Sequence, residues 1–576
     1  MRFDKKRTLF ALGILILAGF AAPLSAWVGP ITIADEAGKT YEDKVSVQFH
    51  PSGAVYVAFM AHDEALSRKD IYLYKYAGAT AKGELVGKVS GGKKYTYEPD
   101  MIITDDGVVH IIWAECDNVQ NDLQLIMYRS YENGAFSPIS TYKEMYIPGI
   151  LDLNSFNREK IDDLNLDVDS SGNKFVAFMT WPGGRGKILS MYGNNAGTEE
   201  PFPLSGRSKH PCVQADDNYV YLVWQQLLGA YTVYFARRPN IDGAEWEAYD
   251  VKGGVHRPVM GLDQNGTPHI AYMADDSEKR QVVYKYWTGN GFSPRETLSE
   301  TPLLYQNVEI AVRDNKNMII SAGIFMATST SFMFNWRENG KWNPDGMVLL
   351  PPAVGAFDNP ATALSSNGIG AFVYNHDRGV FLILSEPLII NALPVAVITA
   401  DKESVYWDEE INFGSTGSFD PDGNIVKYEW KILQDNVTIE GPSITYRFNK
   451  SYNNVRVRLT AIDDKGARGS VDKIISVKAL FTATSTWSKQ LVKTLVFNRE
   501  GNVIQWQPNA KNEAEGYNIV KYKIFRKVDG GDFQEIAEVD GLKRSFADVG
   551  IEAGKTYEYA VSSVDDQGRK SPYDNF

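Results

Sequence analysis

The chain has 576 residues, well beyond the size at which one hydrophobic core stops growing, so a single compact domain is excluded. Hydrophobic residues make up 44% and charged residues 23%, an ordinary globular composition that excludes a wholly disordered chain. The formal charge of −13 argues against a nucleic-acid partner, which would need a basic face. The content of 31 Tyr, 12 Trp, 49 Gly and 25 Pro favours strands and turns over helices. We therefore expect several all-β domains.

The N-terminus has the pattern of a secretory signal peptide over residues 1–26. A basic start is followed by the apolar stretch Leu9–Ala22, and Pro23-Leu24-Ser25-Ala26 predicts cleavage after Ala26. Because Leu24 is less usual than Ala or Val three positions before the cut, an uncleaved N-terminal anchor is the alternative. We expect a monomeric chain that is secreted, periplasmic or on the cell surface, with no membrane span once the leader is removed.

One pattern recurs seven times between residues 44 and 386. Each unit has two alternating segments around an Asp, Asn or Gly turn, then a polar loop, a third segment ending in aromatics, and a fourth segment. The clearest copies are EPDMIITDDGVVHIIWAE (98–115) and RPVMGLDQNGTPHIAYMA (257–274). Four strands per unit are typical of a propeller blade, so the sequence predicts a seven-bladed β-propeller over residues 27–388.

Two local features of the repeat make further predictions. The turn between the first two strands needs a positive φ, which explains the recurring turn residues Gly53, Gly107, Gly172, Asn218, Gly266, Asn317 and Gly368. The seventh unit runs into Pro387 without a fourth strand, whereas Trp27–Ala34 is strand-like and precedes the first unit. We predict that Trp27–Ala34 supplies the missing outer strand and closes the ring, which leaves no open edge.

The segment Asp263-Gln-Asn-Gly266-Thr-Pro-His269-Ile-Ala-Tyr272 resembles the sialidase-like or BNR-type propeller repeats of secreted bacterial proteins. The resemblance implies the fold. Sialidases also carry Asp boxes of the form S-x-D-x-G-x-x-W and an arginine in an R-I-P context, and this chain has neither in full. The shared architecture therefore implies little about shared chemistry.

The periodicity changes after Pro387. The segments GSFDPDGNIVKYEW (417–430) and VRVRLTAIDDKGARGS (455–470) resemble the polycystic kidney disease (PKD) domain, an Ig-like β-sandwich, which we place over residues 394–478. Trp430 is expected to fill its core. The resemblance makes Asp420 and Asp422 candidate calcium ligands, since hard oxygen ligands cluster in such loops. The favoured alternative is that both carboxylates only cap the turn, and we expect no other cofactor.

Residues 480–576 resemble a fibronectin type III domain, a second Ig-like sandwich. The resemblance rests on VIQWQP (503–508), YNIVKYKIFRKV (517–528), FQEIAEV (533–539) and AGKTYEYAVSSVDDQGRKSP (553–572). It places Trp506 on the second strand and Tyr557 at the tyrosine corner, where its hydroxyl would bond back to the chain. Modules of both families are usually spacers or adhesion units, and neither shows a catalytic motif here.

Histidine and cysteine offer few leads to chemistry. His110 and His269 occupy the same position in two units, and a repeated side chain usually serves the repeat, so we expect both to be structural. Cys116 and Cys212 lie in units that are not neighbours, so we expect two separate thiols. The remaining histidines show no metal-binding spacing.

Propeller geometry predicts where a ligand would bind. The loops that enter the first strands and leave the second strands open on one face, around the central channel. The candidate ligand-binding face consists of polar and aromatic residues at these places: Glu98, Asp163, His210, His256, Arg257, Gln306, Asn307, Asn359, Trp181, Gln225, Asp377 and Arg378.

Two functions fit this face. The leading hypothesis is an exported, non-catalytic binding or adhesion protein whose propeller binds an extracellular glycan or protein, with the two sandwiches as spacers. The alternative is a sialidase-like glycoside hydrolase or a polysaccharide lyase with accessory domains. In that case Glu98 with Asp163 or Asp275 would supply the two carboxyl groups that glycoside hydrolysis needs.

Overall fold

The computed structural model describes residues 28–572 apart from short gaps. The gaps are 42–43, 92–94, 117–122, 148–160, 182–183, 194–196, 229, 252–255, 277–278, 300–303, 327–328, 345–347, 350–359, 377–378, 387, 389–391, 449–451 and 494–497. The predicted signal peptide lies outside this range. In the part of the chain that is described, we find no helix with the length and apolar character of a membrane span. Two compact units are present, one reaching Leu393 with Lys465–Ala467 and the other comprising Pro394–Asp464 and the chain from Arg468 onward.

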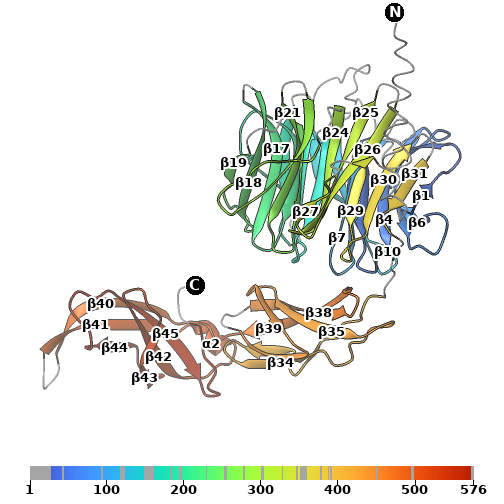
Figure 1. Cartoon of the computed structure of the whole chain (residues 1–576). Helices are drawn as coiled ribbons and strands as arrows, with labels where there is room; N and C mark the ends of the chain where they lie inside the picture. The colour runs from blue at the N-terminus through green and yellow to red at the C-terminus, as the bar shows by residue number, and fades with distance from the viewer. Residues whose placement is uncertain are drawn as a thin grey trace, which may run out of the picture. The chain divides into compact units, whose positions relative to one another are not determined.

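The first unit contains, within the described residues, seven antiparallel sheets of four or five strands (Figure 1). Sheets 1 to 3 are built from β2 (Lys39–Thr40), β3 (Val45–Phe49), β4 (Val55–Asp63), β5 (Arg68–Tyr76) and β6 (Glu84–Lys88); β7 (Tyr95–Ile103), β8 (Val109–Cys116), β9 (Leu123–Glu132), β10 (Ala135–Phe136) and β11 (Ser140–Tyr146); and β12 (Ile161–Val168), β13 (Lys174–Thr180), β14 (Arg185–Met191) and β15 (Thr198–Glu200).

The remaining sheets of this unit follow in chain order. Sheets 4 to 7 are built from β16 (Arg207–Ala215), β17 (Tyr219–Leu228), β18 (Ala230–Pro239) and β19 (Glu247–Asp250); β20 (His256–Leu262), β21 (Pro268–Asp276), β22 (Lys279–Tyr286) and β23 (Glu296–Thr297); β24 (Leu304–Asp314), β25 (Asn317–Met326), β26 (Ser329–Glu338), β27 (Lys341–Trp342) and β28 (Val348–Leu349); and β29 (Ala361–Leu364), β30 (Gly370–His376), β31 (Gly379–Leu384) and β1 (Val28–Ala34).

The innermost strands of these sheets form a closed ring. They are β3, β7, β12, β16, β20, β24 and β29; each contacts the next, and β29 contacts β3. A ring of antiparallel sheets whose inner strands meet around a centre is a propeller-like fold. Most residues of the candidate site come from these inner strands.

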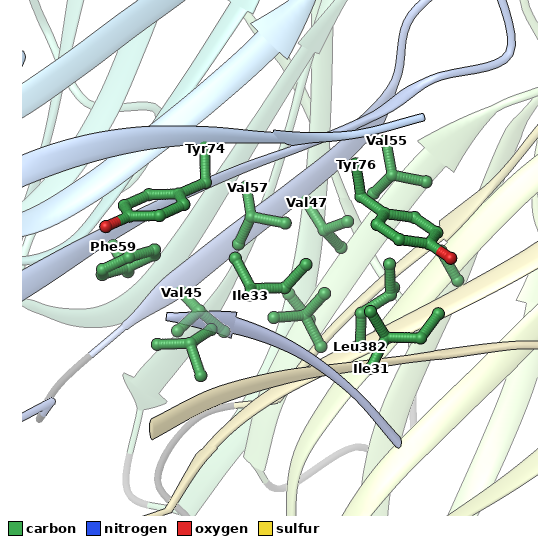
Figure 2. Close-up of a cluster of buried hydrophobic side chains, with 14 of the residues drawn as sticks. Ile31, Ile33, Val45, Val47, Val55, Val57, Phe59, Tyr74, Tyr76 and Leu382 are labelled. Atoms are coloured by element: carbon green, nitrogen blue, oxygen red, sulfur yellow. The ribbon is translucent and has the colours of Figure 1, made fainter. Parts of the chain in front are cut away.

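The ring is closed by the N-terminal strand, as the sequence predicts. Strand β1 pairs antiparallel with β31, with Ile31 opposite Leu382. Figure 2 shows the core that results: Ile31, Ile33 and Leu382 of sheet 7 face the valines and aromatics of sheet 1, among them Val57 and Phe59. All of these side chains are buried, so apolar burial holds the first and last sheets together.

The hairpin between the first two strands is present in all seven sheets, and the predicted positive φ at its turn residue is confirmed in five of them. The turn glycines have φ between +72° and +94°: Gly53, Gly107, Gly172, Gly266 and Gly368. The prediction is wrong for Asn218 and Asn317, which are not among the residues with positive φ. A carboxylate caps both of these turns: Asp216 Oδ1 accepts from the backbone N of Asn218 at 2.7 Å, and Asp314 Oδ1 accepts from Asn317 Nδ2 at 2.8 Å.

Neighbouring sheets are also joined near their outer strands by polar contacts. Between sheets 3 and 4, Arg238 Nε donates to Glu200 Oε2 at 2.9 Å, and Trp246 Nε1 donates to the same oxygen at 3.2 Å. Between sheets 5 and 6, Trp342 Nε1 donates to Glu296 Oε2 at 2.8 Å. The Arg238 side chain is fully buried, so this seam depends on its pairing with Glu200.

The second unit contains two β-sandwiches and one short helix among its described residues. The elements are β32 (Thr399–Ala400), β33 (Ser404–Tyr406), β34 (Glu410–Gly414), β35 (Ile425–Ile432), β36 (Val437–Glu440), β37 (Ser443–Arg447), β38 (Tyr452–Asp463) and β39 (Arg468–Lys478), then β40 (Thr484–Lys493), β41 (Asn498–Gln507), α2 (Ala510–Ala514), β42 (Ile519–Val528), β43 (Gln534–Asp540), β44 (Ser545–Asp548) and β45 (Tyr557–Asp565). Trp430 and Trp506 are buried in the two cores, as expected. Tyr557 accepts a hydrogen bond from the backbone N of Glu552 at 2.7 Å, so its predicted contact with the preceding chain is confirmed.

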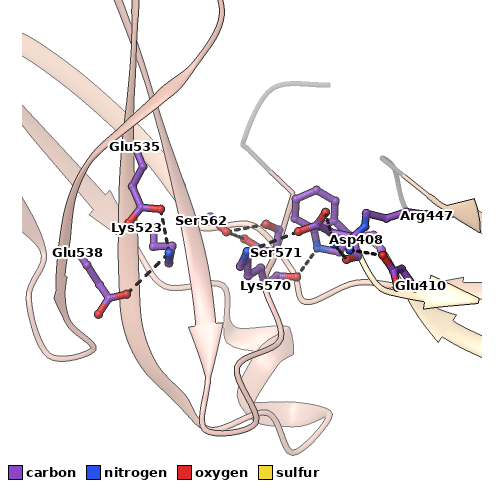
Figure 3. Close-up of polar contacts among 10 residues, drawn as sticks. Asp408, Glu410, Arg447, Lys523, Glu535, Glu538, Ser562, Lys570 and Ser571 are labelled. Atoms are coloured by element: carbon purple, nitrogen blue, oxygen red, sulfur yellow. Dashed lines mark hydrogen bonds and ion pairs between the residues drawn. The ribbon is translucent and has the colours of Figure 1, made fainter.

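The two sandwiches contact each other within this unit. Lys570 Nζ lies 3.5 Å from Asp408 Oδ2, and Figure 3 shows Arg447 and Glu410 beside the same aspartate. The guanidinium of Arg569 lies 4.8 Å from the ring centroid of Tyr406, a stacking contact that fixes one sandwich against the other.

Candidate functional site

Five inner strands share an unusual backbone feature near their starts. Five residues, none of them glycine, have left-handed φ: Glu98 (52°), Asp163 (54°), His210 (51°), Arg257 (40°) and Asn307 (35°). They lie in sheets 2 to 6, and at each one the register between the first and second strands shifts. Such a conformation costs about 1–3 kcal/mol at a non-glycine residue and is typically kept where it positions a functional side chain. We call these five residues the mouth positions.

The mouth positions converge on one pocket. The pocket has a volume of about 230 Å³, it is lined by all seven inner strands, and all five mouth residues are among its lining residues. Each of the five belongs to the ligand-binding face that the sequence predicts. The ring therefore brings together carboxylate, imidazole, guanidinium and amide groups from strands far apart in the chain.

An aspartate and a histidine form the central pair of this pocket. His210 Nδ1 lies 2.8 Å from Asp163 Oδ2, and both side chains are about four-fifths buried. Burial alone would raise the pKa of Asp163, but His210 and Arg257 outweigh it and hold that pKa below its usual range. Burial and the neighbouring Asp163 raise the pKa of Asp162. The pKa values of these two adjacent carboxyl groups are therefore shifted in opposite directions.

The other mouth residues surround this pair. The guanidinium of Arg257 donates to Asn307 Oδ1. Glu98 is only 5% exposed, and its Oε2 accepts from the backbone N of Leu164 at 3.3 Å. An arginine and an amide on one side and a carboxylate on the other leave room for a polar ligand with both acidic and hydroxyl groups.

A second layer of charged groups lies in the same pocket. The ammonium of Lys44 lies 3.4 Å from Asp100 Oδ1 and donates to the carbonyl of Leu164. Burial acts to lower the pKa of Lys44, but Asp100 and Glu98 more than compensate and raise it. Burial raises the pKa of Glu309 to about 7. Asp100 also accepts from the backbone N of Leu166 at 2.9 Å, which ties two inner strands together.

Sequence reasoning missed Lys44, Asp100, Asp162 and Glu309. A signal for the mouth itself was present: a polar residue precedes proline in Glu98-Pro99, His210-Pro211 and Arg257-Pro258. The charged groups of the second layer carry no such signal, because polar and apolar residues alternate along any strand that has one polar face.

Other predicted face residues border the pocket without lining it. Trp181 Nε1 donates to Asp162 Oδ2 at 3.1 Å, and Gln225 Nε2 lies 3.4 Å from His256 Nδ1. Asp275 and Gln306 are placed only by their backbone, in β21 and β24. Asn359, Asp377 and Arg378 lie outside the described residues.

The calcium prediction concerns the second unit. Asp420 Oδ1 accepts from the backbone N of Asp422 at 3.4 Å, as a turn cap would. No group of three His, Cys, Asp or Glu side chains suited to a metal ion occurs among the described residues. Calcium binding stays a prediction.

Fold and pocket together define an all-β protein with a propeller-like ring around a polar, charged pocket. Residues 391–478 match the family model of the PKD domain, which confirms that resemblance. Collagenase ColA of Clostridium perfringens is 35% identical over 112 residues, which are 19% of this chain; the chain spans a tenth of the length of that relative.

Solved structures are also similar to part of the chain. One is a polysaccharide lyase described as a PL25 ulvan lyase, at 12% identity and a TM-score of 0.37, covering 63% of this chain and 94% of that one. Another is the GH93 α-L-arabinofuranosidase of Fusarium graminearum, at 9% identity and a TM-score of 0.38, covering 62% and 97%. Both similarities concern the fold alone.

Proposed function

We propose that the chain is an exported enzyme that cleaves an extracellular glycan, with the seven sheets forming a sialidase-like, seven-bladed β-propeller. The last sandwich is then a fibronectin type III module that, with the PKD domain, acts as a spacer. The observation that supports this proposal is the convergence of five strained mouth positions on one pocket that holds an aspartate-oriented histidine. A mere binding face has no need of such a pair, so the catalytic alternative is favoured over non-catalytic adhesion.

The chemistry of the pocket favours β-elimination. With Nδ1 of His210 engaged by Asp163, Nε2 is the nitrogen that can take a proton, and the aspartate stabilises the charged imidazolium that forms. Arg257 can bind the carboxylate of a uronate, which stabilises the negative charge that develops when the adjacent C–H bond loses its proton. The glycosidic C–O bond at the next ring carbon breaks as the C=C bond forms, and the imidazolium of His210 can return its proton to the departing oxygen. Together these are the steps of a polysaccharide lyase.

Hydrolysis is the second candidate, and one observation favours it. The raised pKa of Asp162 suits a general acid, and Glu98 supplies a second carboxyl group in the same pocket. Asp163 is a poorer partner than the sequence suggests, because it already pairs with His210.

Product analysis tests the proposal. The purified chain is incubated with a panel of neutral, uronate-containing and sulfated polysaccharides. Elimination predicts products with ultraviolet-absorbing unsaturated ends, whereas hydrolysis predicts new reducing ends without them. Asp163→Asn, which is nearly isosteric, should reduce elimination, because it removes the carboxylate that orients His210. If the chain binds a polysaccharide but cleaves none of the panel, the enzyme is contradicted and the non-catalytic binding protein is favoured.

Calcium is tested separately. Titration of Ca²⁺ into the full chain and into an Asp420→Asn variant, followed by the thermal unfolding midpoint, shows binding at this loop as a stabilisation that the variant lacks. The turn-capping alternative predicts the same midpoint with and without Ca²⁺.

A further inference from the structure

Strand β16 of sheet 4 connects the central pocket to a second cavity. His210 and Cys212 of this strand line the central pocket, whereas Gly206 and Ser208 line a cavity of about 440 Å³ between sheets 3 and 4. Ser208 is held at the boundary, where its backbone N donates to the carbonyl of Gly184 at 3.0 Å. The left-handed backbone at His210 interrupts the usual alternation, so neighbouring residues of one strand serve two cavities.

Lys209 stands between Ser208 and His210 in the same strand, and its ammonium group is flanked by aromatic rings. Its ammonium nitrogen is 5.2 Å from the ring centroid of Trp181 and 5.5 Å from that of Tyr231. Trp181 also bonds to Asp162, which lines the central pocket. All three side chains are partly exposed. Among the ion pairs of the described residues none involves Lys209, so no described carboxylate neutralises its charge.

We propose that Lys209, Trp181 and Tyr231, with the cavity beyond them, form a subsite for an anionic sugar unit of the polysaccharide. An ammonium group that no described carboxylate neutralises, set between two aromatic rings, can bind a carboxylate or a sulfate ester while a ring stacks on the sugar. The far cavity is lined by Arg185 and Lys187 and also by the carboxylates Glu199 and Glu200. Lys187 pairs with Glu199 and the buried Arg238 pairs with Glu200, so Arg185 adds a positive charge to this lining. The polysaccharide would leave the central pocket across the hairpin of sheet 3, so the inference rests on the proposed function.

Binding to matched polymers tests the subsite. Native gels containing polygalacturonate or its methyl ester measure recognition of carboxylate, and gels containing dextran sulfate or dextran measure recognition of sulfate. The full chain is compared with Lys209→Met, Lys209→Arg and the control Lys75→Met. Lys75 also lies over a tyrosine ring, 6.0 Å from the centroid of Tyr56, but lines neither cavity.

The expected result is binding to at least one anionic polymer about tenfold tighter than to its neutral partner, because a charge-assisted contact is added. Lys209→Met should weaken this preference, with Arg257 retaining part of it, while Lys209→Arg and Lys75→Met keep it in full. Binding by the wild type to none of the four polymers, equal binding to charged and neutral partners, or an unchanged preference in Lys209→Met would overturn the subsite.

Cleavage measured in the same samples separates the two proposals. A preference that depends on Lys209, without cleavage of either anionic polymer or any other glycan, supports the anion site and contradicts the enzyme. Cleavage by a chain that shows no such preference supports the enzyme and overturns the subsite.

Discussion

The mouth positions and the second-strand histidines are both repeated around the ring. The mouth positions repeat a backbone conformation, whereas the histidines repeat a side chain. At the mouth, five sheets repeat the same left-handed backbone with five different side chains. In the second strands, His110 and His269 repeat the side chain and its contact: each Nδ1 pairs with a tyrosine hydroxyl, at 2.6 Å to Tyr128 and 2.7 Å to Tyr284. Both histidines are buried inside their sheets. Where the side chain repeats, it serves the fold; where only the backbone repeats, the side chains can specialise on one ligand.

The largest effect on stability should come from the seam between sheets 3 and 4. Arg238→Met leaves Glu200 without its buried partner, and breaking such a pair costs about 3–5 kcal/mol. Denaturant unfolding measures this loss. Cleavage per folded molecule should not change, since Arg238 lies far along the sheet from the mouth. A decrease in the free energy of unfolding below about 1 kcal/mol would show that the Arg238–Glu200 pair contributes little to stability.

A large effect on activity at unchanged stability should come from Arg257. Removing a group that stabilises developing charge costs about 10²- to 10³-fold in rate, so Arg257→Met should lower kcat/KM by that factor. Arg257→Lys should recover part of the loss because it keeps the charge. If Arg257→Met cleaves the preferred polysaccharide as fast as the wild type, this arginine has no role in the reaction.

A smaller effect on stability is expected at the second-strand histidines. His110→Phe leaves the Tyr128 hydroxyl without its partner and should cost about 1–3 kcal/mol, with activity per folded molecule unchanged. Its unfolding free energy and its kcat are both measured. A large fall in kcat in a folded His110→Phe variant would contradict the distinction between the two sets of positions.

The smallest and most gradual effect is that of pH. Burial lowers the pKa of His110 and of His50 to about 4, below the 6.5 of an unperturbed histidine. Between these two pKa values the unfolded chain therefore binds more protons than the folded chain. The free energy of unfolding is highest above pH 6.5 and falls as the pH drops toward 4. We expect a slope of about 1 kcal/mol per pH unit or less for each histidine, and a shallower slope in His110→Phe. An identical slope in that variant would show that His110 is not responsible.

The sequence predicted more of the fold than of the site. Ring closure by the N-terminal strand and the starts of the first strands follow from periodicity, because a two-residue alternation defines strands and their ends. The second layer of charged groups does not, since Lys44 and Glu309 come to line one pocket only when the seven inner strands close into a ring. The sequence also gives no sign of the left-handed backbone at Asp163, because this residue is not a glycine and does not precede a proline.

We propose that His210 is the base in the cleavage of a glycan by this pocket. The most direct measurement is kcat/KM of His210→Asn, whose amide can replace Nδ1 toward Asp163 but cannot accept a proton as Nε2 does. On the polysaccharide that the wild type cleaves best, we predict a fall of about 10²- to 10⁴-fold with an unchanged unfolding midpoint. Cleavage at the wild-type rate by this variant would contradict the account.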